Sequence, residues 1–215
     1  MKKLLIPLLI SNIIYAQSFV PDAPELNLKS YILIEPNTNT IIAEFNSDSE
    51  IEPASMTKIM TSYVVADQIA NDLISLDDQV LISEKAWRME GSKMFIEAGK
   101  KVSVSDLLKG IIIQSGNDAS VAIAEYAGGT ERGFVDLMNA YAGSLEMDNT
   151  IFQNSTGLPD ENHFSSAKDL ATLTSDFIKK FPDIYALYKE SNLLLVILSS
   201  LIEINFFGET IHLME

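Results

Sequence analysis

The sequence predicts an α+β fold in which helices pack on an antiparallel sheet, of which only a two-stranded hairpin is recognisable. Residues 31–46 alternate apolar and polar side chains on both sides of PNTNT, which is typical of a β-hairpin with strands near 31–35 and 41–46. Helical periodicity then dominates as far as Pro182. A hairpin followed by helices favours α+β, yet two strands are too few for a stable sheet. We therefore expect the hairpin to belong to a sheet that this chain does not complete.

Residues 1–16 are typical of an export signal. Two lysines precede an apolar run over residues 4–14, and Ala16 offers a small residue for cleavage. A membrane anchor or a buried helix is the alternative, but the run is shorter than the roughly 20 residues of a spanning helix and Pro7 interrupts it. We expect an exported protein, in the periplasm or on the outer face of the cytoplasmic membrane, with residues 17–30 as an extended lead-in.

Five helices are predicted after the hairpin. The first follows Pro53, and its apolar spacing suits a helix largely buried in a core. The others are expected from Ser105, after a loop at 114–117 and up to Gly128-Gly129, over 131–147, and from a cap at Ser165 or Ser166 to a stop at Pro182. The segment between the first two helices reads as loops and short strands.

Composition excludes several kinds of chemistry. Fifteen Lys and Arg against 30 Asp and Glu give a formal charge of −15, which phosphate backbones repel, so we expect no nucleic-acid partner. The chain has no cysteine, which removes thiol nucleophiles, disulfides and thiolate metal sites. His163 and His212 are too few for a His-rich metal site. We expect no metal or other cofactor, and chemistry that depends on Ser, Lys, Asp, Glu, Asn or Tyr.

The first chemical motif is SMTK at residues 55–58, at the predicted start of a helix. Positions i and i+3 share a helix face, so Lys58 Nζ can reach Ser55 Oγ. A serine becomes a nucleophile when a base takes its proton, and a lysine is such a base when burial and nearby positive charge lower its pKa toward neutrality. The spacing alone is weak evidence, because SSAK at 165–168 repeats it and a helix start with an exposed lysine explains it equally.

The second motif is Ser115-Gly116-Asn117, in the predicted loop between two apolar helices. A hydroxyl and an amide on one loop can supply a proton shuttle and a donor to a substrate carbonyl group. An ordinary polar turn between helices is the alternative explanation. Together with SMTK and the export signal, the motif forms a combination of features that chance does not readily explain.

With this combination of motifs the sequence resembles the low-molecular-mass penicillin-binding proteins, which are serine D-alanyl-D-alanine carboxypeptidases. The resemblance covers about residues 21–190 and is carried by segments 30–65, 91–129 and 154–173. It implies an incomplete penicillin-binding-protein/β-lactamase-like transpeptidase fold, with a partial catalytic domain over residues 31–190.

The resemblance also implies a reaction and its residues. Peptidoglycan stem pentapeptides would lose their terminal D-Ala through an acyl-enzyme on Ser55, and β-lactam antibiotics would acylate the same serine. Lys58 would act as base, and Ser115 and Asn117 would assist proton transfer and substrate placement. Substrate would also contact Gly116.

Two further implications concern residues outside these motifs. Gly91 and Ser92 would lie on a substrate-binding loop beside the cleft. His163 fits no role in the family and is predicted to be a surface histidine.

The sequence departs from the family at its third motif. Lys-Thr-Gly, which in the family lies on a core strand, binds the substrate carboxylate and supplies part of the oxyanion hole, does not occur in the chain. The family's later strands, second domain and C-terminal amphipathic membrane anchor are expected to be absent too. Because losing one oxyanion donor costs about 10²–10³-fold in rate, we expect the chain to be catalytically impaired.

Two other functions stay open. A class A β-lactamase shares the first two motifs, but it should carry a Glu-x-x-x-Asn type loop after the second, and residues 154–166 contain no convincing one. A truncated, non-catalytic product would bind muropeptides weakly at most.

Residues 191–215 are predicted to be an aberrant, frameshifted tail. Their composition breaks sharply from the acidic domain, and the alternative is a genuine C-terminus packed on the hairpin. Reading from the third base of each codon, with AT-rich synonyms from Leu193 onwards, can give FTFSNIKQFNRNKFFWRDNSFDG. That string resembles the family segment that leads directly into Lys-Thr-Gly.

Resequencing the gene through and beyond codon 215 tests this prediction. We expect an open frame that continues into Lys-Thr-Gly after a one-base-scale insertion or deletion near Ser191. Unrelated DNA beyond the stop codon would contradict it.

Overall fold

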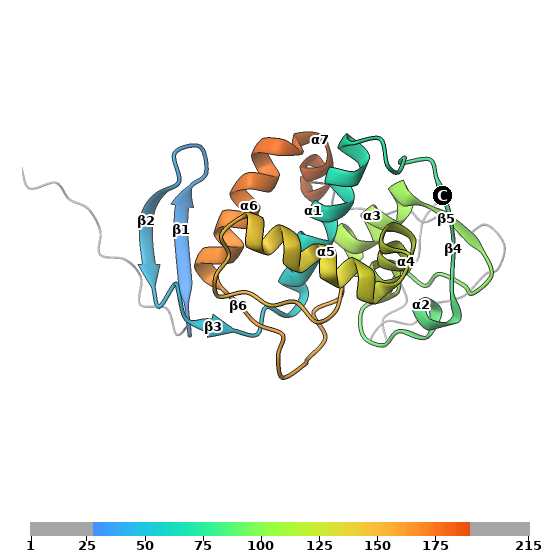
Figure 1. The fold of residues 1–215 in the computed structure, drawn as a ribbon, viewed down its shortest axis with the longest axis horizontal. Helices are drawn as coiled ribbons and strands as arrows, with labels where there is room; N and C mark the ends of the chain where they lie inside the picture. Colours follow the sequence, from blue (N-terminus) through green and yellow to red (C-terminus); the bar gives the residue numbers. More distant parts are fainter. Residues whose placement is uncertain (1–27, 190–215) are drawn as a thin grey trace, which may run out of the picture.

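The computed structural model describes residues 28–189, and its hairpin lies at one end of the molecule with the helices beyond it (Figure 1). Strands β1 (Tyr31–Glu35) and β2 (Thr40–Phe45) pair antiparallel, with an irregularity in register between Leu33 and Ile34. The predicted hairpin is therefore confirmed. The predicted signal peptide, the lead-in up to residue 27 and the predicted tail lie outside the described residues.

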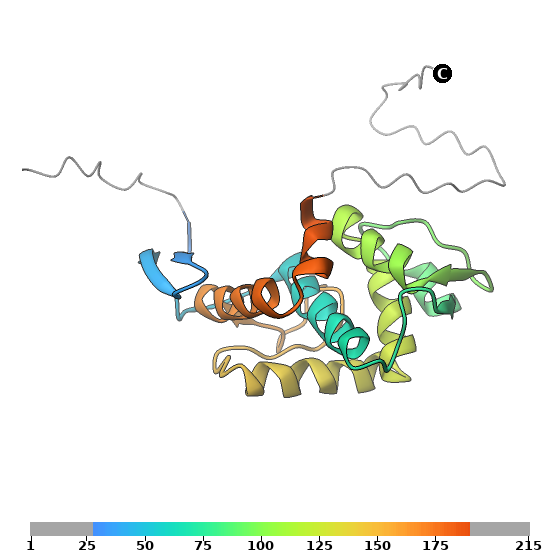
Figure 2. The same cartoon turned by 90° about the horizontal axis from the view of Figure 1, so that it is seen from above.

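A cluster of helices forms the rest of the core. Helix α1 (Thr57–Ala70) is largely buried, as its apolar spacing predicted, and it contacts α3, α4, α5 and α6 (Figures 1 and 2). The other helices are α2 (Glu84–Arg88), α3 (Val104–Gln114), α4 (Asn117–Gly128), α5 (Glu131–Ser144), α6 (Ala167–Lys180) and α7 (Pro182–Tyr185), with 3-10 turns η1 (Ala54–Met56) and η2 (Ala186–Lys189).

Local sequence explains where these helices begin and end. The side chains of Ser103, Thr130 and Ser166 accept hydrogen bonds from the first-turn N–H groups of α3, α5 and α6. The cap of α3 thus lies two residues before the predicted start, whereas the cap at Ser166 agrees with the sequence. Helix α4 ends at Gly128, and Gly129 has a φ of 73°, as the glycine pair predicted.

Short strands connect the helices in two further places. Strand β3 (Glu50–Ile51) pairs with β6 (Ser165–Ser166), and β4 (Gln79–Leu81) pairs with β5 (Lys101–Ser103), both antiparallel. Over residues 28–189, each strand therefore has a single partner. The same residues include no helix with the length and apolar character needed to cross a bilayer.

The hairpin is covered incompletely by the described residues. Strand β1 contacts α6, and an apolar groove of about 470 Å³ runs between them. Several large apolar side chains of the hairpin remain exposed: Leu33, Ile41, Ile42 and Phe45. Unpaired strand edges and exposed apolar side chains both promote association between chains.

We expect the substitution Ile42→Lys to reduce self-association of the purified chain. Ile42 is 62 % exposed, so the change should alter stability by less than about 0.5 kcal/mol while placing a charge on the apolar hairpin. Light scattering against concentration measures the effect. Leu73→Lys, at a position 71 % exposed outside the hairpin, is the matched control. Equal reductions in both variants would contradict a specific role for the hairpin.

Candidate active site

Ser55 lies in η1, on an unusual turn just before α1. The preceding residue, Ala54, has a φ of 46°, in the left-handed region that residues with a Cβ rarely adopt. Gly157 packs against this turn so closely that a Cβ there would lie 1.8 Å from the Ala54 carbonyl oxygen. The turn leaves Ser55 exposed to solvent, at the start of the helix that carries Lys58.

Lys58 is buried beside Ser55, with 4 % of its surface exposed. Its Nζ atom donates to Ser55 Oγ at 3.3 Å and to the Thr156 carbonyl oxygen at 2.7 Å. Burial lowers the pKa of Lys58 to about 8, because desolvation disfavours the ammonium form. A lysine with this pKa has a substantial neutral fraction near pH 7 to 8, as a general base requires.

The second motif lies at the junction of α3 and α4. Ser115 ends α3 with a φ of 53°, and Gly116 precedes Asn117, the first residue of α4. The loop is therefore shorter than the predicted 114–117. Ser115 is partly exposed, whereas Gly116 and Asn117 are buried.

Asn117 is held against the loop that carries Gly91 and Ser92. Its Nδ2 atom donates to the Glu90 carbonyl oxygen at 2.6 Å, and its backbone N–H donates to the Ser92 carbonyl oxygen at 2.7 Å. A Cβ at Gly91 would lie 2.8 Å from Asn117 Nδ2, so this approach needs a glycine. The predicted neighbours of the cleft are thus brought together with Asn117.

The two groups of candidate residues are linked by helix packing. Helix α1, which follows Ser55, contacts both α3 and α4, which carry Ser115 and Asn117. Within residues 28–189, no hydrogen bond joins Ser115 or Asn117 directly to Ser55 or Lys58. No group of three or more His, Cys, Asp or Glu side chains in that range is placed to bind a metal ion.

The repeated spacing at 165–168 does not form a comparable pair. Ser165 is buried and shares a 2.8 Å hydrogen bond with Thr150 Oγ1. The Lys168 side chain is 51 % exposed and pairs with Asp48 at 3.0 Å. The hydrogen bond with Asp48 and its charge raise the pKa of Lys168, so this lysine stays protonated.

The prediction that His163 is a surface residue is wrong. His163 is 4 % exposed, its Nε2 atom lies 2.8 Å from Thr57 Oγ1, and its Nδ1 atom accepts from the Gln153 N–H at 3.2 Å. Because Nδ1 accepts, Nε2 carries the proton and donates to Thr57. The neighbouring residues are polar, but the fold turns the His163 side chain inward onto the start of α1.

Sequence reasoning also missed residues that support the site. Asp118 is buried, and its carboxylate accepts from the N–H groups of Met94 and Ile96 at 3.0 and 3.3 Å, which fixes the chain beyond Ser92. Thr156 contributes a backbone carbonyl group, which no side-chain pattern could reveal. Asp118 directly follows the second motif, in the first turn of α4. This position was the one feature of the sequence that could have indicated a role in supporting the site.

Comparison with known proteins identifies the family. Residues 17–206 match peptidase family S11, D-alanyl-D-alanine carboxypeptidase. The chain belongs to this family. The resemblance stated from the motifs is thereby confirmed.

Relatives in this family are similar over most of the chain. D-alanyl-D-alanine carboxypeptidase DacC of Escherichia coli is 42 % identical over 182 residues, which are 82 % of this chain and 46 % of DacC. DacF of Bacillus subtilis is 43 % identical over 169 residues, 76 % of this chain and 43 % of DacF. The chain therefore spans about half the length of the curated relatives it matches.

Solved structures confirm the predicted fold class. The carboxypeptidase DacD from Francisella tularensis has a TM-score of 0.76 at 44 % identity, over 78 % of this chain and 40 % of that one. Penicillin-binding protein 6B from Escherichia coli has a TM-score of 0.77 at 40 % identity, over 82 % and 57 %. The described residues thus have part of a penicillin-binding-protein fold.

His163 should make the stability of this chain sensitive to mild acid. Burial lowers the pKa of His163, which the charge of Asp160 only partly offsets. The unfolded chain therefore takes up a proton on this histidine at a higher pH than the folded chain does. The free energy of unfolding falls as the pH drops below the histidine pKa of the unfolded chain, roughly 6.5, toward the lower pKa of the folded chain.

Thermal melting at several pH values between about 7.5 and 5 measures this loss. We expect His163→Gln to melt lower than the natural chain at neutral pH but to lose less stability as the pH falls. Identical pH dependence in the two proteins would show that His163 does not carry the effect.

Proposed function

We propose that this chain carries the acylation half of a serine D-Ala-D-Ala carboxypeptidase site, with Ser55 as nucleophile and Lys58 as general base. One observation carries the proposal: a buried lysine amine lies 3.3 Å from Ser55 Oγ, and burial lowers its pKa to about 8. This pairing supplies what a serine hydroxyl lacks, a nearby base that is partly neutral at physiological pH.

The reaction follows from these groups in two stages. Lys58 Nζ takes the Ser55 proton as Oγ bonds to the carbonyl carbon of the penultimate D-Ala. The bond from that carbon to the terminal D-Ala nitrogen then breaks, and this nitrogen receives the proton. Water next hydrolyses the ester, which frees Ser55 and releases the shortened peptide. The N-terminal end of α1 favours the negative charge that develops near Ser55.

The second motif and the neighbouring loop are proposed to handle substrate. Ser115 passes the proton to the leaving nitrogen, and Asn117 donates to a substrate carbonyl group. Gly116, Gly91 and Ser92 line the path of the peptide backbone. The contacts between Asn117 and the 90–92 loop support this role, because they give the loop one position beside α4.

Substrate and location are proposed from the chemistry of the relatives and the N-terminal pattern. The substrate is a peptidoglycan stem peptide ending in D-Ala-D-Ala, and β-lactam antibiotics are covalent inhibitors. Relatives named D-alanyl-D-alanine carboxypeptidase and penicillin-binding protein support both. Residues 1–16 are proposed as a signal peptide for export to the periplasm or the outer face of the cytoplasmic membrane. Residues 31–190 are proposed as the catalytic part, and residues 191–215 as the frameshifted tail.

A second candidate is a non-catalytic product that binds muropeptides weakly at most. Lys-Thr-Gly, which carries the substrate carboxylate site in the family, does not occur among the 215 residues. A serine β-lactamase is less well supported, since residues 154–166 hold no convincing Glu-x-x-x-Asn loop.

Labelling with a fluorescent penicillin tests the acylation site. We expect a chimera of residues 1–190 and the remaining part of Escherichia coli DacC to form a covalent adduct, and Ser55→Ala to abolish it. The labelling rate should rise with pH around the Lys58 pKa of about 8, since the neutral amine is the active form.

Ser165→Ala is the matched control and should keep the label, because Lys168 is solvated and paired. Labelling that survives Ser55→Ala would overturn the assignment. A labelled chimera beside an unlabelled 215-residue chain would support the non-catalytic candidate for this chain.

A further inference from the structure

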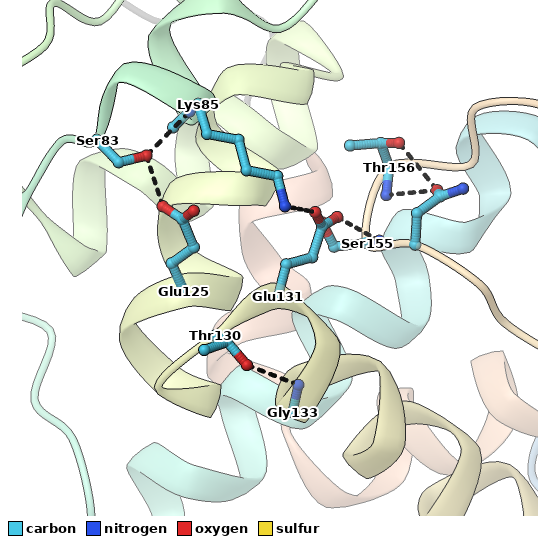
Figure 3. A network of polar contacts seen from close by, with 10 residues as sticks. Ser83, Lys85, Glu125, Thr130, Glu131, Gly133, Ser155 and Thr156 are labelled. Carbon is cyan, nitrogen blue, oxygen red and sulfur yellow. Dashed lines mark hydrogen bonds and ion pairs between the residues drawn. The ribbon is translucent and has the colours of Figure 1, made fainter.

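The carboxylate of Glu131, at the start of α5, lies between Lys85 of α2 and Ser155 (Figure 3). Glu131 Oε1 accepts from the Ser155 N–H at 3.1 Å and from Ser155 Oγ at 2.8 Å. Its other oxygen, Oε2, forms an ion pair with Lys85 Nζ of α2 at 2.7 Å. The Glu131 side chain is 13 % exposed, so these partners take the place of water.

The loop that Glu131 holds has little freedom of its own. Asn154 Oδ1 accepts from the N–H groups of Thr156 and Gly157 at 3.1 and 2.7 Å, which closes a tight turn. Thr61 Oγ1 of α1 donates to the Ser155 carbonyl oxygen at 2.7 Å. The turn is therefore bonded to α1 on one side and to α5 on the other, and its orientation follows both.

The same turn presents the carbonyl group that binds Lys58. The Thr156 oxygen accepts from Lys58 Nζ at 2.7 Å, shorter than the 3.3 Å from Nζ to Ser55 Oγ. One peptide bond separates this group from Ser155, which Glu131 holds. A displacement of Ser155 would move the Thr156 carbonyl group and admit water to the Lys58 amine.

Glu131 is charged in this setting. Burial alone would raise its pKa, but the hydrogen bonds from Lys85 and Ser155 more than offset burial, and the pKa of Glu131 is lowered. Hydrogen bonds to an ionised carboxylate are about twice as strong as neutral ones. A carboxylate at this position is therefore a firm anchor for the turn.

We propose that Glu131 is a positioning residue for Lys58. It fixes Ser155, so that the Thr156 carbonyl group keeps the Lys58 amine shielded from water and next to Ser55 Oγ. The proposal rests on the proposed function for its catalytic meaning, but the contact chain itself does not involve substrate. Glu131 lies outside both motifs, and nothing in its local sequence marks it as part of the site.

Two physical effects of removing Glu131 have opposite signs. If the turn loosens, water reaches the amine and the Lys58 pKa rises toward its solvated value of roughly 10.4. If Glu131 acts only through its negative charge, removing it disfavours the ammonium form and the Lys58 pKa falls. Among the titratable groups, His163 bonds to Thr57, the residue before Lys58, and burial lowers the pKa of His163, which favours its neutral form.

Direct titration of Lys58 in the 215-residue chain separates these effects. The probe is the NMR signal of ¹³Cε-labelled lysine, assigned by its loss in Lys58→Arg. We expect Glu131→Ala to raise the Lys58 pKa by on the order of one unit. Glu131→Gln should leave it near the natural value, because the amide oxygen still accepts from Ser155.

The control is Asp136→Asn, on the same helix. Asp136 is 65 % exposed and pairs with Arg132 at 3.4 Å, so its loss removes a charge from α5 without touching the turn. We expect no change in the Lys58 pKa. Ser155→Ala is a second test that keeps every Glu131 atom, and we expect a smaller upward shift.

Three results would overturn the proposal. They are a lower Lys58 pKa in Glu131→Ala, an unchanged pKa in a folded Glu131→Ala whose melting temperature falls, and equal upward shifts in Glu131→Ala and Glu131→Gln. If Glu131→Ala does not fold, an unchanged pKa in Ser155→Ala overturns it. The proposed function fails independently, when the penicillin label survives Ser55→Ala, whatever the Lys58 titration shows.

Discussion

The arrangement of the candidate site depends on the burial of one amine. An ammonium group taken out of water is unfavourable unless oxygen atoms bind it, and Lys58 has two, the Ser55 hydroxyl and the Thr156 carbonyl group. Neither partner carries a charge, so the amine keeps a lowered pKa instead of forming an ion pair. A carboxylate in place of the Thr156 carbonyl group would favour the ammonium form and raise the Lys58 pKa.

This requirement explains the shape of the turn at 154–157. A backbone carbonyl group must point at the amine, so its peptide must be fixed by other bonds, which come from Asn154, Thr61 and Glu131. Close packing adds a second constraint, because Gly157 leaves no space for a Cβ beside Ala54. The turn and the Ser55 segment therefore hold each other in place, with Ala54 at a positive φ.

The two ends of the described structure differ in how completely they are packed. Around α1, large side chains such as Tyr63, Phe134 and Phe177 are fully buried, and the candidate site lies on this well-packed part. The hairpin instead contacts α6 along an apolar groove and leaves much of its apolar surface exposed. The helical part can thus position the candidate residues, whereas within residues 28–189 the hairpin pairs with no further strand, and two strands alone are rarely a stable sheet.

Local geometry determined what could be predicted from the sequence. The hairpin follows from alternation around a turn, the helix limits from caps and glycines, and the Ser55–Lys58 pair from the i, i+3 spacing on a helix. These features need only a few neighbouring residues. The tertiary structure decided what depends on distant ones: Lys58 meets a carbonyl group 98 positions away, and His163 bonds to Thr57 across 106. It also separated SMTK from SSAK, whose spacing is identical, because burial is set by the whole core and not by the motif.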